Sequence, residues 1–579
     1  MSLVRSVLVG AILTTIGMGQ SAPGQPRSLS DRELQNLEAF ARLFGYIRYF
    51  HPTGAVATAN WEEIAIHSVP GVLSAGNSRE LAAALTAAFA PVTEGVSVVP
   101  TGTTVPPLAL KPGPYLIEWR HHGVGLTDAP PYYSERVTRR TTGDPGEIDT
   151  ITAELPGGAL CRVPRVLYTE TPGVFRLKPL PSAQPVASPA DRSVRLAAVI
   201  IAWNVMQHFY PYFPAVHTDW PQALTAALKS AATDTPVQFL STLRRMMVAL
   251  HDGHGRVTLP WLDTVSSPVG WDWVEGRLIV TDVPAWSSGI TRGDAVLSIN
   301  GRKTADALAA AEAEIPSATP QWLLARALGT ALHYNEPLGA IGEGPPSEPL
   351  ALEIEPFDSP GVTRKVSVER KPWRPVVEVR PQPIGEIEPG IIYMDLSRAS
   401  SAAFKAELPR MQQARGLIFD LRGYPNSELG IDYLQYLSPG PMSGSPMRVP
   451  IVSHPDHRIT QWVPSAWPLP PIAPRLTART AFLTNGRAIS FSESIMAVVE
   501  GYRLGDIVGG PTAGTNGNTN TFSVPGGYKI TWSGMKVLKT DGSQLHGVGI
   551  APTVPAARTR AGVAAGRDEI LERALSLFK

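Results

Sequence analysis

A serine between an apolar run and a helical pattern is the residue best placed for chemistry in this sequence. Residues 481–483 are apolar and end in a Thr-Asn-Gly turn, and Ser490 and Ser492 precede a helical pattern that runs to Val499. Such a junction exposes a serine Oγ, and the first free N–H groups of the helix can stabilise an oxyanion. Either serine can instead serve only as a helix cap. The pattern alone leaves both roles open.

Composition indicates an ordinary globular protein. The chain has 579 residues, 43% of them hydrophobic, and a formal net charge of +1, which suits three or four domains. The basic residues are scattered, so we expect no nucleic-acid partner. Cys161 is the only cysteine, which excludes an internal disulfide.

The first 22 residues are typical of a secretory signal. Arg5 precedes an apolar run at 7–18 that is short for a bilayer span, and small residues follow it. No later stretch is long and apolar enough to cross a membrane. We therefore expect an exported protein, periplasmic or extracellular, with no integral membrane segment after signal removal.

The first half of the chain indicates a duplicated helical scaffold. Residues 29–100 and 186–262 both show helical periodicity, and the spacing from Phe50 to Trp61 equals that from Phe209 to Trp220. Between them, alternating residues at 101–180 predict a small β-rich insert. We interpret the His121-His122 pair of this insert as surface residues without a metal role.

The second half of the chain contains two further domains. The phrase Gly289-Ile-Thr-Arg-Gly-Asp-Ala-Val-Leu-Ser-Ile-Asn-Gly301 strongly resembles PDZ domains and places a PDZ-like domain at 263–372. That resemblance implies either a groove for peptide tails or only a spacer. Residues 373–579 alternate strand and helix patterns, which predicts an α/β core. The strands are expected at 391–396, 416–421, 481–483, 506–508, 522–524, 528–533 and 535–539.

Four segments of this core resemble one family. They are Leu417-Ile-Phe-Asp-Leu-Arg-Gly423, Asn485 to Glu493, Ile507 to Gly514 and Asp541 to Pro552. In this order they resemble the tail-specific (C-terminal processing) serine peptidases. With the PDZ-like phrase, the resemblance covers about residues 249–554. It implies a multidomain α/β fold with a catalytic core of the tail-specific peptidase type.

The resemblance places the nucleophile on Ser490, with Ser492 as the second candidate. It assigns one oxyanion donor to the N–H of Phe491. The second donor is expected in the loop after Arg422, from Gly423 or Asn426. In that loop, Asn426-Ser427 replaces the Gly-Gly pair of the family.

The residue expected to act as general base differs from the one that many members of this family use. Where many family members carry a lysine, this chain has Thr515, so a Ser–Lys dyad is not available there. Lysines 529, 536 and 539 lie on strands and are expected to be solvated. The segment Leu250 to Gly255 resembles the histidine segment of the tricorn-type branch, which implies His254 as general base.

Two neighbours of His254 have open roles. Asp252 either orients an imidazole or only fixes the turn. His546 stands where the tricorn-type branch has its orienting carboxylate, and it is expected to relay to His254 or to contact the substrate carbonyl. Together with His251 these residues can also be interpreted as a metal cluster, but their spacing in a turn is unlike H-E-x-x-H. We expect no metal and no cofactor.

The leading hypothesis is an exported serine hydrolase that cleaves peptides through an acyl-enzyme, with peptide or protein substrates. One alternative is an inactive peptidase-like protein that binds apolar ligands or peptide tails. Another is an esterase-like hydrolase on the same fold.

Overall fold

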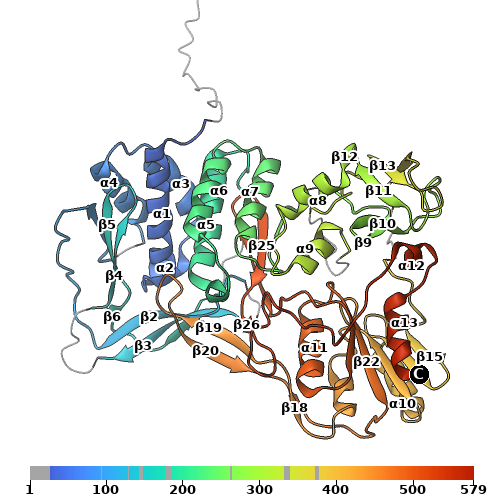
Figure 1. Cartoon of the computed structure of the whole chain (residues 1–579). Helices are drawn as coiled ribbons and strands as arrows, with labels where there is room; N and C mark the ends of the chain where they lie inside the picture. Colours follow the sequence, from blue (N-terminus) through green and yellow to red (C-terminus); the bar gives the residue numbers. More distant parts are fainter. Residues whose placement is uncertain are drawn as a thin grey trace, which may run out of the picture.

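The computed structural model describes residues 27–92, 94–127, 130–141, 148–177, 186–260, 262, 264–330, 339–371 and 377–579. The expected signal segment at 1–22 lies outside the described residues. Figure 1 shows the helical N-terminal part beside two α/β parts formed by the second half of the chain. The mixed α/β, multidomain class expected from the sequence is confirmed.

The two helical regions pack against each other through α1 and α3 of the first and α5 and α6 of the second. α1 begins at a capping box, in which Ser30 and Glu33 exchange hydrogen bonds, and its apolar face contacts α5. α3 and α6 each begin at the tryptophan, Trp61 or Trp220, that marks the repeat. The helices are α1 Asp31–Phe50, α2 Gly54–Thr58, α3 Trp61–Leu73, α4 Ser78–Phe89, α5 Arg192–Phe209, α6 Trp220–Ala231 and α7 Pro236–Val248.

The strands of the 101–180 segment are divided between two sheets. One is a small sheet in the order β1-β5-β4, and the other is completed by strands from much later in the chain, in the order β20-β19-β2-β3-β7 with β6 and β26 attached. The strands are β1 Ser97–Pro100, β2 Tyr115–His122, β3 Tyr133–Arg140, β4 Thr150–Leu155, β5 Ala159–Pro164, β6 Leu167–Thr169, β7 Val174–Arg176, β19 Met447–Val452, β20 Ile459–Ser465 and β26 Lys536–Val537.

The surface interpretation of His121 is wrong. Its side chain is buried, with Nε2 at 2.7 Å from the carbonyl oxygen of Tyr49 and Nδ1 at 2.8 Å from Ser134 Oγ. β2 is covered by the end of α1 on this face, and both ring nitrogens of His121 satisfy polar groups there.

The segment expected to be PDZ-like folds into one antiparallel sheet with two helices. Its strand order is β14-β13-β11-β10-β9, with β12 paired to β11, and α8 packs on β11. The elements are β9 Gly270–Val274, β10 Arg277–Asp282, β11 Ala295–Ile299, β12 Arg302–Lys303, α8 Thr304–Glu312, α9 Pro320–Ala327, β13 Leu350–Glu355 and β14 Arg364–Val368.

The α/β core is a sheet with helices on both faces. Its order is β15-β16-β17-β22-β23-β27, and the pairs from β16 to β27 are parallel. On β22, Phe482 packs with the α11 side, whereas Ala481 and Leu483 pack with α13. The elements are β15 Ile384–Glu388, β16 Ile391–Asp395, α10 Ser401–Met411, β17 Gly416–Asp420, β18 Met442–Ser443, β21 Pro468–Leu469, β22 Arg479–Thr484, α11 Phe491–Tyr502, β23 Asp506–Gly509, β27 Val554–Pro555, α12 Arg560–Ala564 and α13 Glu569–Leu575.

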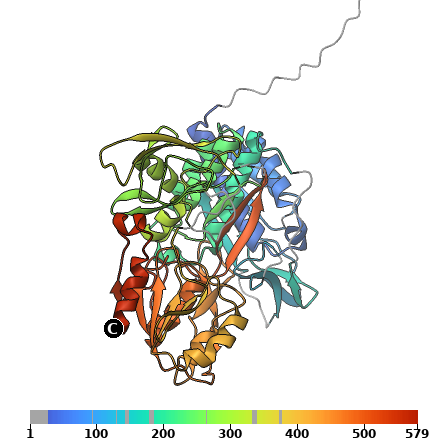
Figure 2. The same cartoon turned by 90° about the vertical axis from the view of Figure 1, so that its right-hand side faces the viewer.

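A three-stranded sheet joins this core to the helical regions. β8 (Arg256–Thr258), which follows α7, pairs with β25 (Tyr528–Ser533), and β25 also pairs with β24 (Thr519–Val524). Figure 1 and Figure 2 both show β25 standing beside the green helices, away from the strands of the core sheet. The segment that carries His254 is thereby attached to the second half of the chain.

Candidate active site

Ser490 lies at a strained turn between β22 and α11. Its backbone has φ 60° and ψ −113°, which is a conformation that a residue with a side chain rarely adopts. Although it occupies the N-cap position, its side chain makes no capping hydrogen bond, and the residue is half-buried. Its backbone N–H donates to the carbonyl oxygen of Thr515 at 2.9 Å. A strained strand-to-helix turn of this kind presents a serine Oγ for nucleophilic attack.

Ser492 has a different environment. It is fully buried, and its Oγ donates to the carbonyl oxygen of Gly423 at 2.8 Å. This bond ties the first turn of α11 to the loop after β17. The structure therefore separates the two serines, because only Ser490 has a side chain next to solvent.

The Glu493 carboxylate accepts three hydrogen bonds from the loop 512–515. Its Oε1 accepts from Thr512 Oγ1 at 2.6 Å and from the Gly514 N–H at 2.7 Å, and its Oε2 accepts from the Thr515 N–H at 2.7 Å. Burial raises the pKa of Glu493 to about 7, although these donors oppose the rise. Since Thr515 in turn accepts from Ser490, Glu493 holds the loop that supports the serine backbone.

The imidazole of His254 is held by Ser533, and its backbone is held by Asp252. It is buried, its Nδ1 lies 2.9 Å from Ser533 Oγ, and its backbone N–H donates to Asp252 Oδ1 at 3.0 Å. Ser533 at the end of β25 also bonds to Asp252. Ser533 is a functional candidate that the sequence pattern does not single out, because its position opposite His254 follows from the β8–β25 pairing.

Thr515 connects the serine segment to the histidine segment. Its carbonyl oxygen accepts from Ser490, and its buried side chain lies so close to Gly253 that a Cβ there would collide with Thr515 Oγ1. Gly253 is therefore required for the close approach of the two loops. Its carbonyl oxygen accepts from Trp322 Nε1 at 2.8 Å, which anchors the turn from α9.

His546 lies in the same cluster. It is buried, stacks on Tyr212 with ring centroids 4.0 Å apart, and feels the charges of Asp252 and His254. Burial holds the pKa of His546 below its ordinary value, so the ring is neutral at physiological pH. Neither ring nitrogen has a hydrogen-bond partner of normal geometry among the described residues, although the backbone of His251 lies close. The structure thus brings Asp252, His254 and His546 together.

The N–H groups expected to bind the oxyanion differ in the partners that they have in the fold. The N–H of Gly423 donates to the Leu421 carbonyl oxygen, and that of Asn426 to the Leu396 carbonyl oxygen, both at 2.8 Å. Both donors are therefore engaged within the fold. Phe491 N–H instead contacts the hydroxyl of Tyr424, which also hydrogen-bonds to the Ser490 side chain. Burial raises the pKa of Tyr424, so a neutral phenol contacts the Ser490 side chain.

Comparison with known proteins identifies the region around this turn. Residues 451–556, which include Ser490, Glu493 and Thr515, match peptidase family S41. The chain carries a peptidase S41 domain. By this domain it is a serine-type peptidase.

Solved structures share the fold of the S41 domain and its surroundings. The mature form of CPAF complexed with lactacystin is similar at 15% identity and a TM-score of 0.53, over 67% of this chain and 98% of that one. A serine-to-alanine mutant of CPAF is similar at 15% identity and a TM-score of 0.55, over 67% and 97% of the two chains. At this identity the likeness shows the fold. A search of curated protein sequences finds no match.

The Asp-Leu-Arg motif next to the S41 domain has a structural role. The Arg422 guanidinium donates to Asp420 through Nε at 3.0 Å and Nη2 at 2.6 Å, and to both oxygens of Asp568 at 2.7 Å. Burial raises the pKa of Asp420, but Arg380 and Arg422 more than offset this and lower it to about 2. This buried network fixes the loop that carries Gly423 and Tyr424.

The S41 domain also places an aromatic side chain against Phe491, the residue after Ser490. Trp467 packs edge-on against Phe491 with ring centroids 5.8 Å apart. Trp467 belongs to the Pro- and Gly-rich stretch 438–474, which forms the β18–β21 pair and the β19–β20 hairpin. Part of this stretch therefore lies next to the candidate site.

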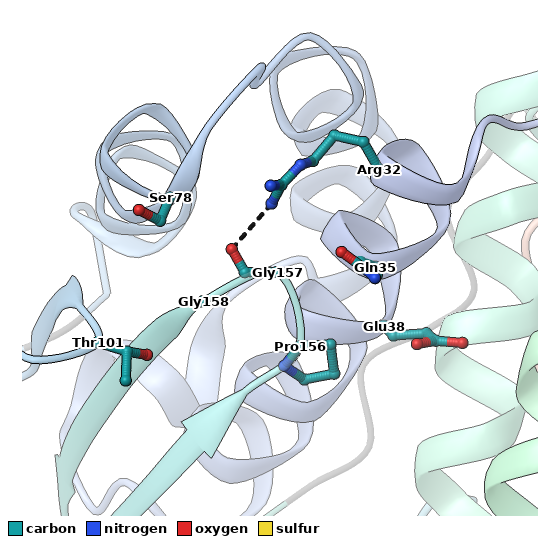
Figure 3. Close-up of a pocket in the computed structure, with 8 residues that line it drawn as sticks. All are labelled: Arg32, Gln35, Glu38, Ser78, Thr101, Pro156, Gly157 and Gly158. Carbon is teal, nitrogen blue, oxygen red and sulfur yellow. Dashed lines mark hydrogen bonds between the residues drawn. The ribbon is translucent and has the colours of Figure 1, made fainter.

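Neither a metal site nor a membrane span is found among the described residues. In that part of the chain, no group of three or more His, Cys, Asp and Glu side chains is arranged to hold a metal ion, and no helix is long and apolar enough to cross a membrane. A polar depression of about 620 Å³ lies between α1, α4 and the β4–β5 turn, where Arg32 donates to the Gly157 carbonyl oxygen at 2.9 Å (Figure 3). It contains none of the residues singled out for chemistry.

Proposed function

We propose that the chain is an exported peptidase in which Ser490 attacks the peptide carbonyl and His254 transfers the proton. The observation that carries this proposal is the conformation of Ser490. Ser490 is held at φ 60° and ψ −113°, is half-buried and makes no capping bond, and its side chain instead contacts the Tyr424 hydroxyl. As a nucleophile, it needs this strained turn to present its Oγ.

The proposed base supports the same chemistry. His254 is held by Ser533 and Asp252 at a turn that contacts Thr515, and Thr515 supports the backbone of Ser490. Phe491 N–H supplies the oxyanion contact at the start of α11, where the helix dipole favours negative charge. The expected export, periplasmic or extracellular, rests on the apolar run at residues 7–18.

Ser490→Ala is the direct test. The full chain is incubated with a fluorophosphonate probe and separately with a peptide library, and products are measured by mass spectrometry. We expect labelling of the wild type on Ser490 only, and a loss of turnover of at least about 10³-fold in Ser490→Ala. Unchanged turnover in this variant would overturn the assignment.

Ser492→Ala is the matched control. It removes the bond to the Gly423 carbonyl oxygen but not the proposed nucleophile, so the probe should still label the variant. A wild type that neither reacts with the probe nor cleaves the library would favour the alternative of an inactive binding protein. Cleavage of ester substrates alone would favour the esterase-like alternative.

A further inference from the structure

The imidazole of His254 is attached to a carboxylate through a hydroxyl group. His254 Nδ1 lies 2.9 Å from Ser533 Oγ, and Ser533 Oγ donates to Asp252 Oδ1 at 2.7 Å. All three residues are buried, with at most 4% of their surface exposed. Charged and polar groups so far from water interact strongly, and their geometry is well defined.

Backbone pairing sets this arrangement. β8 and β25 pair in antiparallel register, with Lys529 opposite Thr258, Ile530 opposite Val257 and Thr531 opposite Arg256. Two further steps in the same register place Ser533 opposite His254. The Ser533 N–H donates to Asp252 Oδ2 at 2.6 Å, and the His254 N–H to Asp252 Oδ1 at 3.0 Å, so backbone groups orient the carboxylate as well.

The donors and acceptors of Ser533 and Asp252 determine which ring nitrogen of His254 carries the proton. A carboxylate only accepts hydrogen bonds, so the single hydroxyl hydrogen of Ser533 is directed to Asp252. Ser533 Oγ must then accept the bond from His254, which requires a hydrogen on Nδ1. The neutral ring therefore has its lone pair on Nε2, the atom that a general base needs.

We infer that Asp252, acting through Ser533, is the orienting carboxylate of this site and holds His254 in the Nδ1–H tautomer. This inference rests on the proposed function of Ser490 and His254. It places the carboxylate two residues before the base, whereas the closing Gly-Ile-x-Pro segment carries His546. Asp252 and Ser533 are positioning residues, since they act through the imidazole.

The proton balance of the reaction follows from this tautomer. Ser490 Oγ bonds to the carbonyl carbon while its proton passes to His254 Nε2, and the imidazolium is stabilised by the charge of Asp252 through Ser533. The same proton passes to the leaving amine when the C–N bond breaks. Water then attacks the acyl-enzyme and gives its proton to Nε2, which returns it to Ser490. Asp252 and Ser533 neither gain nor lose a proton in these steps.

Other titratable groups lie near the hydrogen-bonded residues Asp252, Ser533 and His254. They are His546 and the phenols of Tyr132, Tyr210 and Tyr212. Burial lowers the pKa of His546 and raises the pKa of each phenol, so all four are neutral at physiological pH. Two basic side chains also lie near. The buried Arg326 guanidinium donates to the carbonyl oxygens of Gly253 and Gly255, on either side of His254, and His251 acts on His546. Asp252 is the carboxylate that hydrogen-bonds to Ser533 and so stabilises the imidazolium.

Kinetics of Asp252→Asn and Ser533→Ala test the inference. We expect kcat to fall by about 10² to 10⁴ in Asp252→Asn and by about 10 to 10² in Ser533→Ala, with KM within about twofold of the wild type. The acidic limb of the kcat/KM profile should move to lower pH by about one unit in Asp252→Asn, because the imidazolium loses its counter-charge. Ser445→Ala, at a buried serine whose Oγ has no partner among the described residues, should leave all these values unchanged.

The tautomer itself is measured by NMR of the full chain labelled with ¹⁵N-histidine, with His254 assigned by the signals missing in His254→Gln. Nδ1 should be protonated and Nε2 unprotonated, in the wild type and in Ser490→Ala. A proton on Nε2, or unchanged kinetics in folded Asp252→Asn, would overturn the inference. If the variants do not fold, the wild-type tautomer still decides it. Full turnover in Ser490→Ala together with a proton on Nδ1 would instead overturn only the proposed function.

Discussion

Tyr424 contacts both groups of the site that a substrate carbonyl must reach. Its hydroxyl hydrogen-bonds to the Ser490 side chain and to the N–H of Phe491, and it packs against the small apolar cluster that contains Ile489 and Ala513. In the proposed mechanism, the phenol occupies the place that the carbonyl oxygen of the substrate takes. It must leave before the carbonyl can enter.

The residue-scale prediction is that Tyr424→Phe binds substrate more tightly. Removing a competing hydrogen bond worth about 0.5–1.5 kcal/mol should lower KM by about two- to tenfold and leave kcat within about twofold. Steady-state kinetics on one peptide measure both values. Tyr433→Phe, which removes a buried hydroxyl without a partner among the described residues, is the control and should change neither. A large fall in kcat would show instead that the Tyr424 hydroxyl is an oxyanion donor.

The sequence could identify Ser490 and His254 as candidates, because each belongs to a short contiguous motif. It could not choose between Ser490 and Ser492, since the choice depends on backbone conformation and burial. It also could not find Ser533, whose hydroxyl meets Asp252 across 281 residues of chain. The same limit applies to Gly423 and Asn426, whose N–H groups are engaged by carbonyl oxygens of the surrounding loops.

At the scale of elements, regular strands were predictable and their partners were not. The pattern at 528–533 matches β25 residue for residue, and the buried apolar runs at 391–396 and 416–421 correspond to β16 and β17. Period-two and apolar-run patterns report how one strand is buried. They carry no information on pairing, so neither the β8–β25 pair nor the β2–β19 pair was foreseen.

Glu493 links two elements, α11 and the loop 512–515, and it makes the stability of this link depend on pH. Its pKa is raised from 4.5 to about 7 by burial, so the folded state binds the proton more tightly than the unfolded state. The stabilisation is complete below about pH 4.5 and is lost as the pH rises through about 7, with a total of roughly 3 kcal/mol.

The element-scale prediction concerns Glu493→Gln. The wild-type melting temperature should fall between pH 5 and pH 8, and the fall should be smaller in the variant, which has no proton to lose. Differential scanning calorimetry at four pH values measures the two slopes. Glu500→Gln, on the same helix but half-buried and paired with Lys539, should keep the wild-type slope. If the melting temperature depends equally on pH in Glu493→Gln and in the wild type, the stability does not depend on titration of the Glu493 carboxyl.

At the scale of the whole molecule, the core of the helical regions includes side chains from the second half of the chain. Val452, Tyr528, Ile530 and Trp532 are buried in the same apolar cluster as α1, α5 and α7. The β19–β20 hairpin is also fixed to the helices, because Tyr46 and Gln207 both donate to Asp456 at 3.0 Å. The helical regions and these strands therefore share one core, whereas the segment 263–372 has an apolar core of its own.

The whole-molecule prediction is that residues 373–579 alone do not form the site. Without the first half, β25 loses β8, β19 loses β2, and the four core side chains become exposed. We expect this segment to bind a hydrophobic dye and to show no fluorophosphonate labelling of Ser490. Full-length His254→Ala is the control that lacks only the base, and it should keep the wild-type near-UV circular dichroism and bind no dye. Labelling of the isolated segment at the full-length rate would mean that the nucleophile needs neither His254 nor the shared core, and would contradict both the base and the architecture derived for it.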